Sequence, residues 1–464
     1  MNTTAVIAVI DVGKTNKKLL LFDQEYRIVY EQSARFPEST DEDGDPCEDL
    51  ESLRQLVSDS LQTVLQCKEF RVKAVNFAAY GASFVYLDEK GQPMAPLYNY
   101  LKPYPESLKE QFYGEYGGEE KVSFETASPV LCSLNSGMQL YRVKFEKPEL
   151  FRRIKYALHL PQYLSYLVSG TPCSEITSIG CHTQLWNFQT KFYHQWVYRE
   201  GIIEKFPPLW PSDRLMPTSS PGAGYGVGVG LHDSSAALIP YLVSFREPFV
   251  LISTGTWCIS LNSFNDTPLT PEELRQDCLC YLSYQGTPVK ASRLFAGQEH
   301  EDGVNRIAAH FNQAPEYYHI LPFEPETVAA LQQRTKDPIG ASFSKGGLRI
   351  SQFAARSMTS FASGKEAYHQ LIMDIVALQQ QATGLVINGS PVKRIFVDGG
   401  FSKNDIYMNL LATAFPQMEV YAASIAQATS LGAALAVHEE WNEKPLPHNI
   451  VQLKHFTGAQ HAVS

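Results

Sequence analysis

The feature that most constrains this chain is a hairpin pattern that occurs twice, about half the chain apart. The first copy is DVGKTNKK at residues 11–18, between the apolar segments 5–10 and 19–22. The second is STGTW at residues 253–257, between the segments 249–252 and 258–261. Glycine permits a tight turn and a close approach of the backbone to a ligand, and N–H groups and hydroxyls in such a turn can bind phosphate oxygens. The pair predicts a duplicated domain that grips a nucleotide from both sides.

Length and composition narrow the class of protein. A chain of 464 residues is long enough for two core-forming domains. Its net charge of −10, without a long Lys/Arg run, disfavours a nucleic-acid-binding protein. No segment is long and apolar enough to span a membrane, and the N-terminus lacks the basic region of a signal peptide. The eight cysteines are scattered without a C-x-x-C pair, which favours reduced thiols and a cytoplasmic protein.

The apolar periodicity of the first 80 residues predicts a layered α/β unit. We expect an antiparallel meander of three strands over residues 6–12, 17–22 and 27–33. A loop over residues 38–49, a helix over 49–67 and a buried strand over 72–79 should follow. This order is consistent with a ribonuclease-H-like fold. Residues 136–170 look mainly helical, and residues 360–388 predict a long helix. Strands and helices then alternate over residues 394–397, 403–415, 418–421 and 426–439.

The first hairpin carries residues suited to phosphate and metal chemistry. Asp11 ends the first strand, and a carboxylate there can hold a hydrated Mg²⁺. Thr15 and Asn16 offer side-chain donors, and Lys17 or Lys18 a positive charge. The alternative is an ordinary hairpin with an Asp turn, which the second hairpin makes less favoured.

Asp233 is the candidate general base. It follows the glycine-rich residues 222–230 and opens a predicted helix, so it is either an N-cap or the group that takes a proton from a substrate hydroxyl. His232 either binds substrate hydroxyls or lies on the surface. The glycine-rich run contains no G-x-G-x-x-G and follows no strand, and the chain has no P-loop motif, which excludes those two nucleotide sites. A further glycine pair, Gly399 and Gly400, lies where a strand meets a helix whose N-terminus favours anions.

In this order, the four segments resemble the FGGY carbohydrate kinase family over nearly the whole chain. The family's first phosphate hairpin, D-x-G-x-T/S-x-x-K/R, is matched by Asp11, Gly13, Thr15 and Lys18, and its second is similar to residues 253–257. The setting of its catalytic aspartate is matched by Gly230, Asp233 and Ala237, and its adenosine segment by Gly399, Gly400 and Asn404. Within the family, the rhamnulokinase-like branch looks nearest, from residues 80–88, 183–185 and 230–234.

The resemblance implies a set of roles for individual residues. Asp233 is the catalytic residue, and Asp11 holds Mg²⁺ through water. The substrate is bound by Gly81, Ser83, His232 and Asp233. ATP and its phosphates are bound by Gly13, Lys14, Thr15, Asn16, Lys18, Thr254, Gly255, Thr256, Gly399, Gly400 and Asn404.

The resemblance also implies an α/β fold of two ribonuclease-H-like (actin/hexokinase-type) domains with a central cleft, over residues 1–244 and 245–464. The expected function is transfer of the γ-phosphoryl group from ATP, with Mg²⁺, to a sugar hydroxyl. The expected sugar is a ketose such as L-rhamnulose, L-fuculose or a pentulose. The partners are then ATP and a small sugar, with neither nucleic acid nor membrane, and the resemblance allows a homodimer.

Three departures from the family pattern keep a second hypothesis open. Ser83 replaces a common Asp, Gln427 stands where Glu is usual, and the segment around Ala296 lacks the Asn and Gln found near the nucleotide in related kinases. The alternative is a catalytically degenerate, actin-like protein that binds a nucleotide or a sugar.

Overall fold

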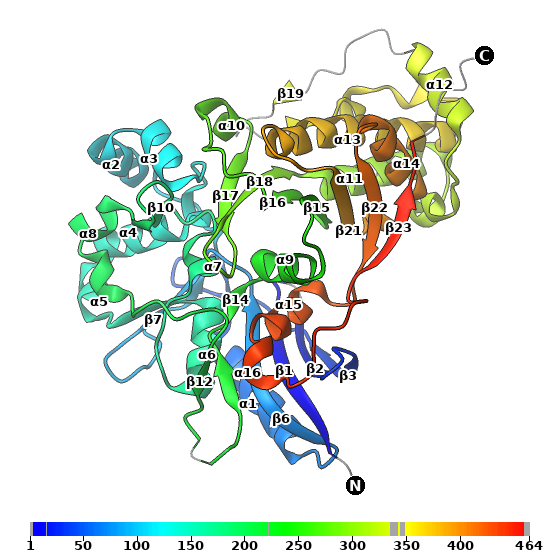
Figure 1. Ribbon diagram of the computed structural model, residues 1–464. Coiled ribbons are helices and arrows are strands. Elements are labelled where there is room, and N and C mark those ends of the chain that lie inside the picture. The colour runs from blue at the N-terminus through cyan, green and yellow to red at the C-terminus, as the bar shows by residue number, and fades with distance from the viewer. Residues whose placement is uncertain (1–2, 15, 221, 335–341, 344–348, 459–464) are drawn as a thin grey trace. The chain divides into compact units, whose positions relative to one another are not determined.

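The computed structural model describes residues 3–458 except 15, 221, 335–341 and 344–348. By contacts between residues, the chain forms two compact units (Figure 1). Unit 1 comprises Met1–Ser244 with the two returning segments Cys280–Pro288 and Ala426–Ile450. Unit 2 comprises Phe245–Leu279, Val289–Ile425 and Val451–Ser464. The sequence-based division at residues 244 and 245 stays a prediction for the functional domains. By contacts, the two returning segments pack with unit 1.

Unit 1 is built on a mixed sheet that has seven strands within the described residues. Their order is β12-β13-β6-β1-β2-β3, and β14 also pairs with β6. The strands are β1 (Thr4–Val12), β2 (Lys17–Asp23), β3 (Ile28–Ala34), β6 (Phe70–Ala79), β12 (Leu215–Pro217), β13 (Gly226–Gly228) and β14 (Leu231–His232). β1 to β3 form the predicted antiparallel meander, whereas β6 runs parallel to β1, β13 and β14.

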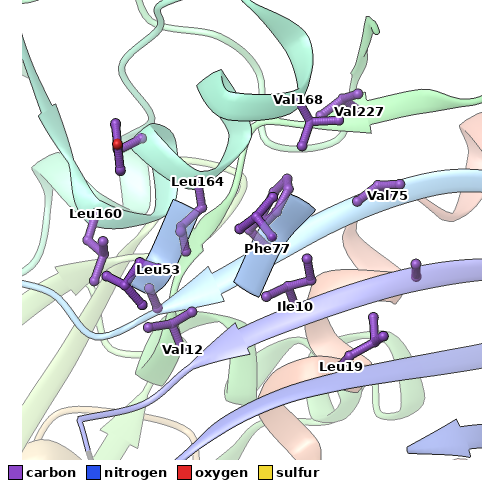
Figure 2. Packing of buried hydrophobic residues seen from close by; sticks show 14 of the residues in the cluster. Ile10, Val12, Leu19, Leu53, Val75, Phe77, Leu160, Leu164, Val168 and Val227 are labelled. Atoms are coloured by element: carbon purple, nitrogen blue, oxygen red, sulfur yellow. The ribbon is translucent and has the colours of Figure 1, made fainter. Parts of the chain in front are cut away.

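The unit 1 sheet is buried on both faces. Val6, Ala8, Ile10 and Val12 of β1 belong to a core cluster with residues of α1 (Leu50–Gln66) and α6 (Leu160–Ser169), as Figure 2 shows for Ile10, Val12, Leu53 and Leu164. Side chains alternate along a strand, so Asp11 points to the opposite face. That face is covered by α15 (Ala428–Ala436), which receives a hydrogen bond from the Asn76 amide at the Ala433 carbonyl.

The other elements of unit 1 surround this sheet. The helices are α2 (Glu106–Tyr116), α3 (Glu119–Thr126), α4 (Ser136–Glu146), α5 (Pro148–Arg153), α7 (Ile176–Ile179), α8 (Gln195–Arg199), α9 (Asp233–Ser244) and α16 (His438–Trp441). The short strands are β4 (Ser39–Thr40), β5 (Pro46–Glu48), β7 (Phe84–Leu87), β8 (Leu97–Tyr98), β9 (Tyr156–His159), β10 (Trp186–Asn187) and β11 (Phe192–Tyr193).

Unit 2 repeats the strand arrangement of unit 1. β15 (Phe249–Thr254) pairs antiparallel with β16 (Cys258–Asn262) and parallel with β21 (Arg394–Gly399), as β1 pairs with β2 and β6. The described sheet has the order β17-β18-β16-β15-β21-β22-β23. Its other strands are β17 (Cys278–Leu282), β18 (Pro288–Leu294), β22 (Glu419–Ser424) and β23 (Gln452–Phe456). The helices are α10 (Pro271–Arg275), α11 (Ala296–Phe311), α12 (Pro325–Arg334), α13 (Gly364–Ile387) and α14 (Asp405–Ala414), and β19 (Ser342–Phe343) pairs with β20 (Arg349–Ile350).

Most predicted elements of the repeated core are confirmed, and two segments contain short strands that were not expected. The acidic residues 38–49 were expected to be loop but contain β4 and β5, because the Pro46–Glu48 backbone pairs with both Ser39–Thr40 and Leu97–Tyr98. Residues 136–170 are mainly helical, as expected, with α4, α5 and α6, and they also include β9, which pairs with β7. In both cases, backbone pairing with a distant segment outweighs the local pattern. In the described part of the chain, no helix has the length and apolar composition needed to cross a bilayer.

Candidate active site

Two carboxylates flank the carboxyl end of β6. In the strand register, Asp11 of β1 lies opposite Ala78 of β6, and Leu231 of β14 lies opposite the same residue from the other side. Asp233 follows two residues later as the first residue of α9. Because neighbouring strands lie about 4.8 Å apart, the Asp11 backbone and the end of β14 are separated by roughly 10 Å. The register therefore brings Asp11 and Asp233 to one edge of the sheet.

Asp233 combines access to solvent with an unfavourable setting for its charge. Its side chain is 34% exposed, and its Oδ1 accepts hydrogen bonds from the Ser234 N–H (2.6 Å) and the Ser234 hydroxyl (3.3 Å). His232 Nε2 lies 3.3 Å from the same oxygen. Burial raises the pKa of Asp233 to about 6 and lowers the pKa of His232 to about 4. At neutral pH the histidine is uncharged, and Asp233 is a stronger base than an ordinary aspartate.

Asp11 is held by the returning helix α15. Its Oδ2 accepts a hydrogen bond of 2.7 Å from the Ser430 hydroxyl. Burial raises the pKa of Asp11 to about 6, against the lowering effect of the Ser430 hydrogen bond, and the charge of Asp233 adds to the rise. Carboxylate oxygens are the donors that Mg²⁺ prefers, and a divalent cation would relieve the cost of ionising these two acids. The residues present therefore fit the expected cation.

The first hairpin closes as predicted, with a buried lysine beneath it. The Gly13 N–H donates to the Asn16 carbonyl at 3.0 Å. Lys17 is only 2% exposed, and its ammonium lies 3.1 Å from Glu48 Oε1. Lys17 therefore has a structural role in the turn. Thr15, which was predicted to bind phosphate, lies outside the described residues.

The other two lysines of the hairpin reach different partners. Lys14 is partly exposed and lies 3.0 Å from Glu38. Lys18 donates a 2.7 Å hydrogen bond to the side chain of Gln427, whose backbone is left-handed with φ 56° at the start of α15. Gln427 thus keeps a direct contact with the hairpin, although it replaces the expected glutamate.

The predicted substrate residues have different surroundings. A Cβ added to Gly81 would lie 2.7 Å from the His232 ring and 3.1 Å from Cys181 Sγ, so glycine is what allows this close approach. Ala82 has φ 61°, a left-handed backbone conformation that non-glycine residues seldom adopt. Ser83 is buried, and its hydroxyl donates to the Tyr98 carbonyl at 3.4 Å. Gly81, His232 and Asp233 are therefore brought together, whereas the Ser83 hydroxyl has a partner within the fold.

In unit 2, Thr254 joins the second hairpin to the glycine pair. Its hydroxyl donates to the Asp398 carbonyl and accepts from the Phe401 N–H at 3.0 Å. Its carbonyl accepts from the Gly400 N–H at 3.2 Å. Gly399 has φ 88°, and a Cβ there would lie 1.9 Å from the Thr254 carbonyl oxygen. Thr254, Gly255, Gly399 and Gly400 therefore form one cluster, in which the Thr254 hydroxyl already has partners. Thr256 lies on the turn between β15 and β16.

A pocket of about 400 Å³ opens beside this cluster. It is lined by Thr254, Gly255, Gly297, His300, Tyr318, His319, Leu321, Gly400, Phe401, Lys403, Asn404 and Asp405. Asn404 caps α14, because its Oδ1 accepts from the Tyr407 N–H, and its amide donates to the Tyr368 hydroxyl at 2.6 Å. His300 and Tyr318, whose rings meet edge to face, were missed by the sequence reasoning. The signal available was Gly297, a glycine in the first turn of a helix that closely follows a strand.

The chain belongs to the FGGY family of carbohydrate kinases. The model of the N-terminal domain of this family matches residues 6–238. The model "Carbohydrate kinase FGGY, C-terminal domain" matches residues 246–445. These matches confirm the resemblance stated from the motifs.

The curated relatives are distant and matched in part. A rhamnulokinase from Halalkalibacterium halodurans is 26% identical over 267 residues, 54% of either chain. A rhamnulokinase from Mannheimia succiniciproducens is 23% identical over 274 residues, 57% of this chain and 55% of the relative. The chain thus matches about half the length of these curated relatives.

Solved structures match over nearly the whole chain. A carbohydrate kinase from Novosphingobium aromaticivorans has a TM-score of 0.81 at 23% identity, covering 99% of this chain and 95% of that one. A xylulose kinase from Lactobacillus acidophilus has a TM-score of 0.78 at 16% identity, covering 98% of this chain and 94% of that one. At these identities the likeness establishes the fold, and the predicted fold class is confirmed.

Proposed function

We propose that this protein is an ATP-dependent carbohydrate kinase that phosphorylates a hydroxyl group of a ketose such as L-rhamnulose, L-fuculose or a pentulose. The observation that supports this most directly is the pair of carboxylates, Asp11 and Asp233, on either side of the carboxyl end of β6, each with its pKa raised to about 6. Family membership supports the reaction class. The rhamnulokinase relatives support a ketose as the substrate.

Asp233 is the proposed general base. Its ionised carboxylate takes the proton of the attacking hydroxyl while the hydroxyl oxygen forms a bond to the γ-phosphorus. The bond from that phosphorus to the β–γ bridging oxygen breaks, and ADP leaves with the electron pair. Ser234 and His232 both contact Oδ1, and no donor within the described residues contacts Oδ2. Oδ2 is therefore the atom proposed to accept the proton.

The phosphate side of the proposal rests on Asp11 and the two hairpins. Asp11, held by Ser430, would bind Mg²⁺ through water, and the bound cation would offset negative charge on the nucleotide phosphates. Lys14, Asn16 and Lys18 of unit 1 are the proposed phosphate contacts there. In unit 2, the Gly399–Gly400 turn and the pocket beside it are proposed for the adenosine.

A catalytically degenerate binding protein is the less favoured alternative. A binding protein has no need of a general base, whereas Asp233 has a partly exposed carboxylate whose pKa lies close to the pH at which a base works well. The departures at Ser83 and Gln427 do not favour the alternative either, because both side chains have hydrogen-bond partners within unit 1.

The proposal is tested by a coupled ADP-release screen over L- and D-ketoses, ketopentoses and polyols, with Asp233→Asn measured in parallel. We expect one subset of sugars to raise ADP release well above the sugar-free rate, and the variant to lose that stimulation. ADP release independent of every sugar would contradict the proposed reaction. Equal stimulation of the variant would contradict the role of Asp233.

A further inference from the structure

We propose that Cys181, His182 and His232 form a binding site for Zn²⁺ beside Asp233, and that Zn²⁺ bound there excludes the sugar. One ligand atom from each of the three residues lies within 4.8 Å of the other two. A thiol with two imidazoles is a donor set typical of Zn²⁺ rather than of Mg²⁺. The metal site stands independently of the proposed function, whereas exclusion of the sugar rests on it.

Both imidazoles are oriented through their second nitrogen. His182 Nδ1 lies 3.1 Å from the Leu134 carbonyl, which can only accept, so Nδ1 carries the proton and Nε2 the lone pair. His232 Nδ1 lies 3.3 Å from the Ser235 hydroxyl, whose own proton is donated to the Leu282 carbonyl. In the tautomer in which His232 Nδ1 donates to this hydroxyl, its Nε2 carries the lone pair that a metal needs. Metal-binding histidines are commonly fixed in this way by an acceptor at the other ring nitrogen.

Gly81 keeps the space beside two of the ligand atoms free of a side chain. A Cβ added to Gly81 would lie 2.9 Å from His232 Nε2 and 3.1 Å from Cys181 Sγ, so a single point lies close to both atoms. Gly81 does not have a left-handed backbone, so an alanine adds no backbone strain there, but its Cβ would displace the His232 ring, which lies 2.7 Å away. Tetrahedral Zn²⁺ with these ligands requires separations of about 3.3–3.8 Å between ligand atoms. The side chains would therefore close in by about 1 Å.

Asp233 supplies a fourth donor. Its Oδ1 lies 3.3 Å from His232 Nε2, a separation at which both atoms can bind one Zn²⁺ ion. Binding replaces the S–H bond of Cys181 with a Zn–S bond and releases the proton to solvent. The same ion would bind the carboxylate of the proposed general base through Oδ1, so sugar and metal would compete for one site.

The test uses the full-length protein, freed of metal by a chelator and titrated with Zn²⁺ against a chromophoric zinc indicator. We expect one equivalent of Zn²⁺ per chain in the wild type. Cys181→Ser and His182→Gln should each weaken binding by at least about tenfold, and Gly81→Ala should weaken it by filling the space. Cys173→Ser is the matched control, because Cys173 is also a buried thiol of unit 1 but packs against Met216 and Val229. It should bind Zn²⁺ like the wild type.

Substitution with Co²⁺ reports on the ligands themselves. A sulfur-to-cobalt charge-transfer band is expected in the wild type and in Cys173→Ser, and should be absent from Cys181→Ser. Thermal melts of each metal-free variant check that it is folded. Zn²⁺ affinity equal in the wild type and in Cys181→Ser would overturn the proposal, as would displacement of Zn²⁺ by Mg²⁺ at similar concentrations.

Zn²⁺ titration in the presence of a ketose distinguishes the proposed metal site from the proposed function. A ketose that supports ADP release should raise the apparent Kd for Zn²⁺ in proportion to its concentration. If the protein binds one equivalent of Zn²⁺ but phosphorylates no sugar, the proposed metal site stands and the proposed kinase function is rejected. Sugar phosphorylation that is insensitive to bound Zn²⁺ would reject the competition.

Discussion

Gly432→Ala tests whether the two carboxylates depend on the packing of α15 against α9. A Cβ at residue 432 would lie 1.8 Å from the Ala236 carbonyl oxygen and 2.6 Å from its carbon. This carbonyl is approached so closely for a physical reason. In a regular helix it would accept from the N–H four residues later, but that residue is Pro240, which has none.

The size of the effect follows from this distance. Real Cβ atoms essentially never come within 3.0 Å of a heavy atom, so α15 and α9 would have to separate by more than about 1 Å. Overpacking of this kind costs about 1–3 kcal/mol, and replacing a helical glycine by alanine returns about 0.5–1 kcal/mol. We expect a net loss of stability of about 1–2 kcal/mol.

The same displacement should reach the reaction. α9 begins at Asp233, and α15 carries the Ser430 hydroxyl that binds Asp11, so separating the helices moves Asp233 relative to β6 and moves Ser430 away from Asp11. A misplacement of about 1 Å can lower an enzymatic rate roughly a hundredfold. We therefore expect kcat to fall by about that factor.

Urea unfolding and sugar-dependent ADP release measure the two effects. The matched control is Gly114→Ala in α2 of the same unit, where an added Cβ meets nothing within 4 Å. It should leave activity unchanged and stabilise the protein slightly. The reasoning is refuted if Gly432→Ala unfolds at the wild-type urea concentration and keeps wild-type kcat.

Four further predictions concern the acids and the nucleotide pocket. Asp233→Asn should lower kcat by about 10²–10⁴-fold and leave the Kd for ADP within about twofold, as measured by calorimetry; an unchanged kcat would reject the base. Because the pKa of Asp233 is raised to about 6, kcat/KM should rise with pH through about 6 and level off above it, and a profile flat down to pH 4 would count against this. The pKa of Asp11 is also raised, from 3.8 to about 6, so the stabilising contribution of its protonated form is complete below about pH 4 and is lost as the pH rises through 6. The Asp11→Asn variant should therefore unfold at a higher urea concentration than the wild type at pH 8, but not at pH 4. Asn404→Ala removes the cap of α14 and should cost about 1 kcal/mol of stability, with a higher KM for ATP if the adjacent pocket holds the nucleotide.

The local parts of this site could be predicted from the sequence. Alternating apolar residues around Gly13 and Gly255 indicated both hairpins, and the residues before and after Asp233 indicated a helix that begins there. These features depend on residues that are neighbours in the chain, so the sequence pattern alone predicts them.

The parts that depend on distant contacts could not be predicted. Ser430 binds Asp11 across 419 positions of sequence, and Lys18 meets Gln427 across 409. Nothing in the local pattern around Ser430 indicates that α15 returns to unit 1. The pattern also did not distinguish Lys17, which is buried against Glu48, from the more accessible Lys14.

The measurement that tests the central claim most directly follows the labelled γ-phosphoryl group of ATP in a single turnover with an accepted ketose. The account predicts that the label appears in a sugar phosphate with the wild type, and that Asp233→Asn binds ATP but forms this product at least about a hundredfold more slowly. Label released only as inorganic phosphate, or equal rates of sugar phosphate formation in the two proteins, would contradict it.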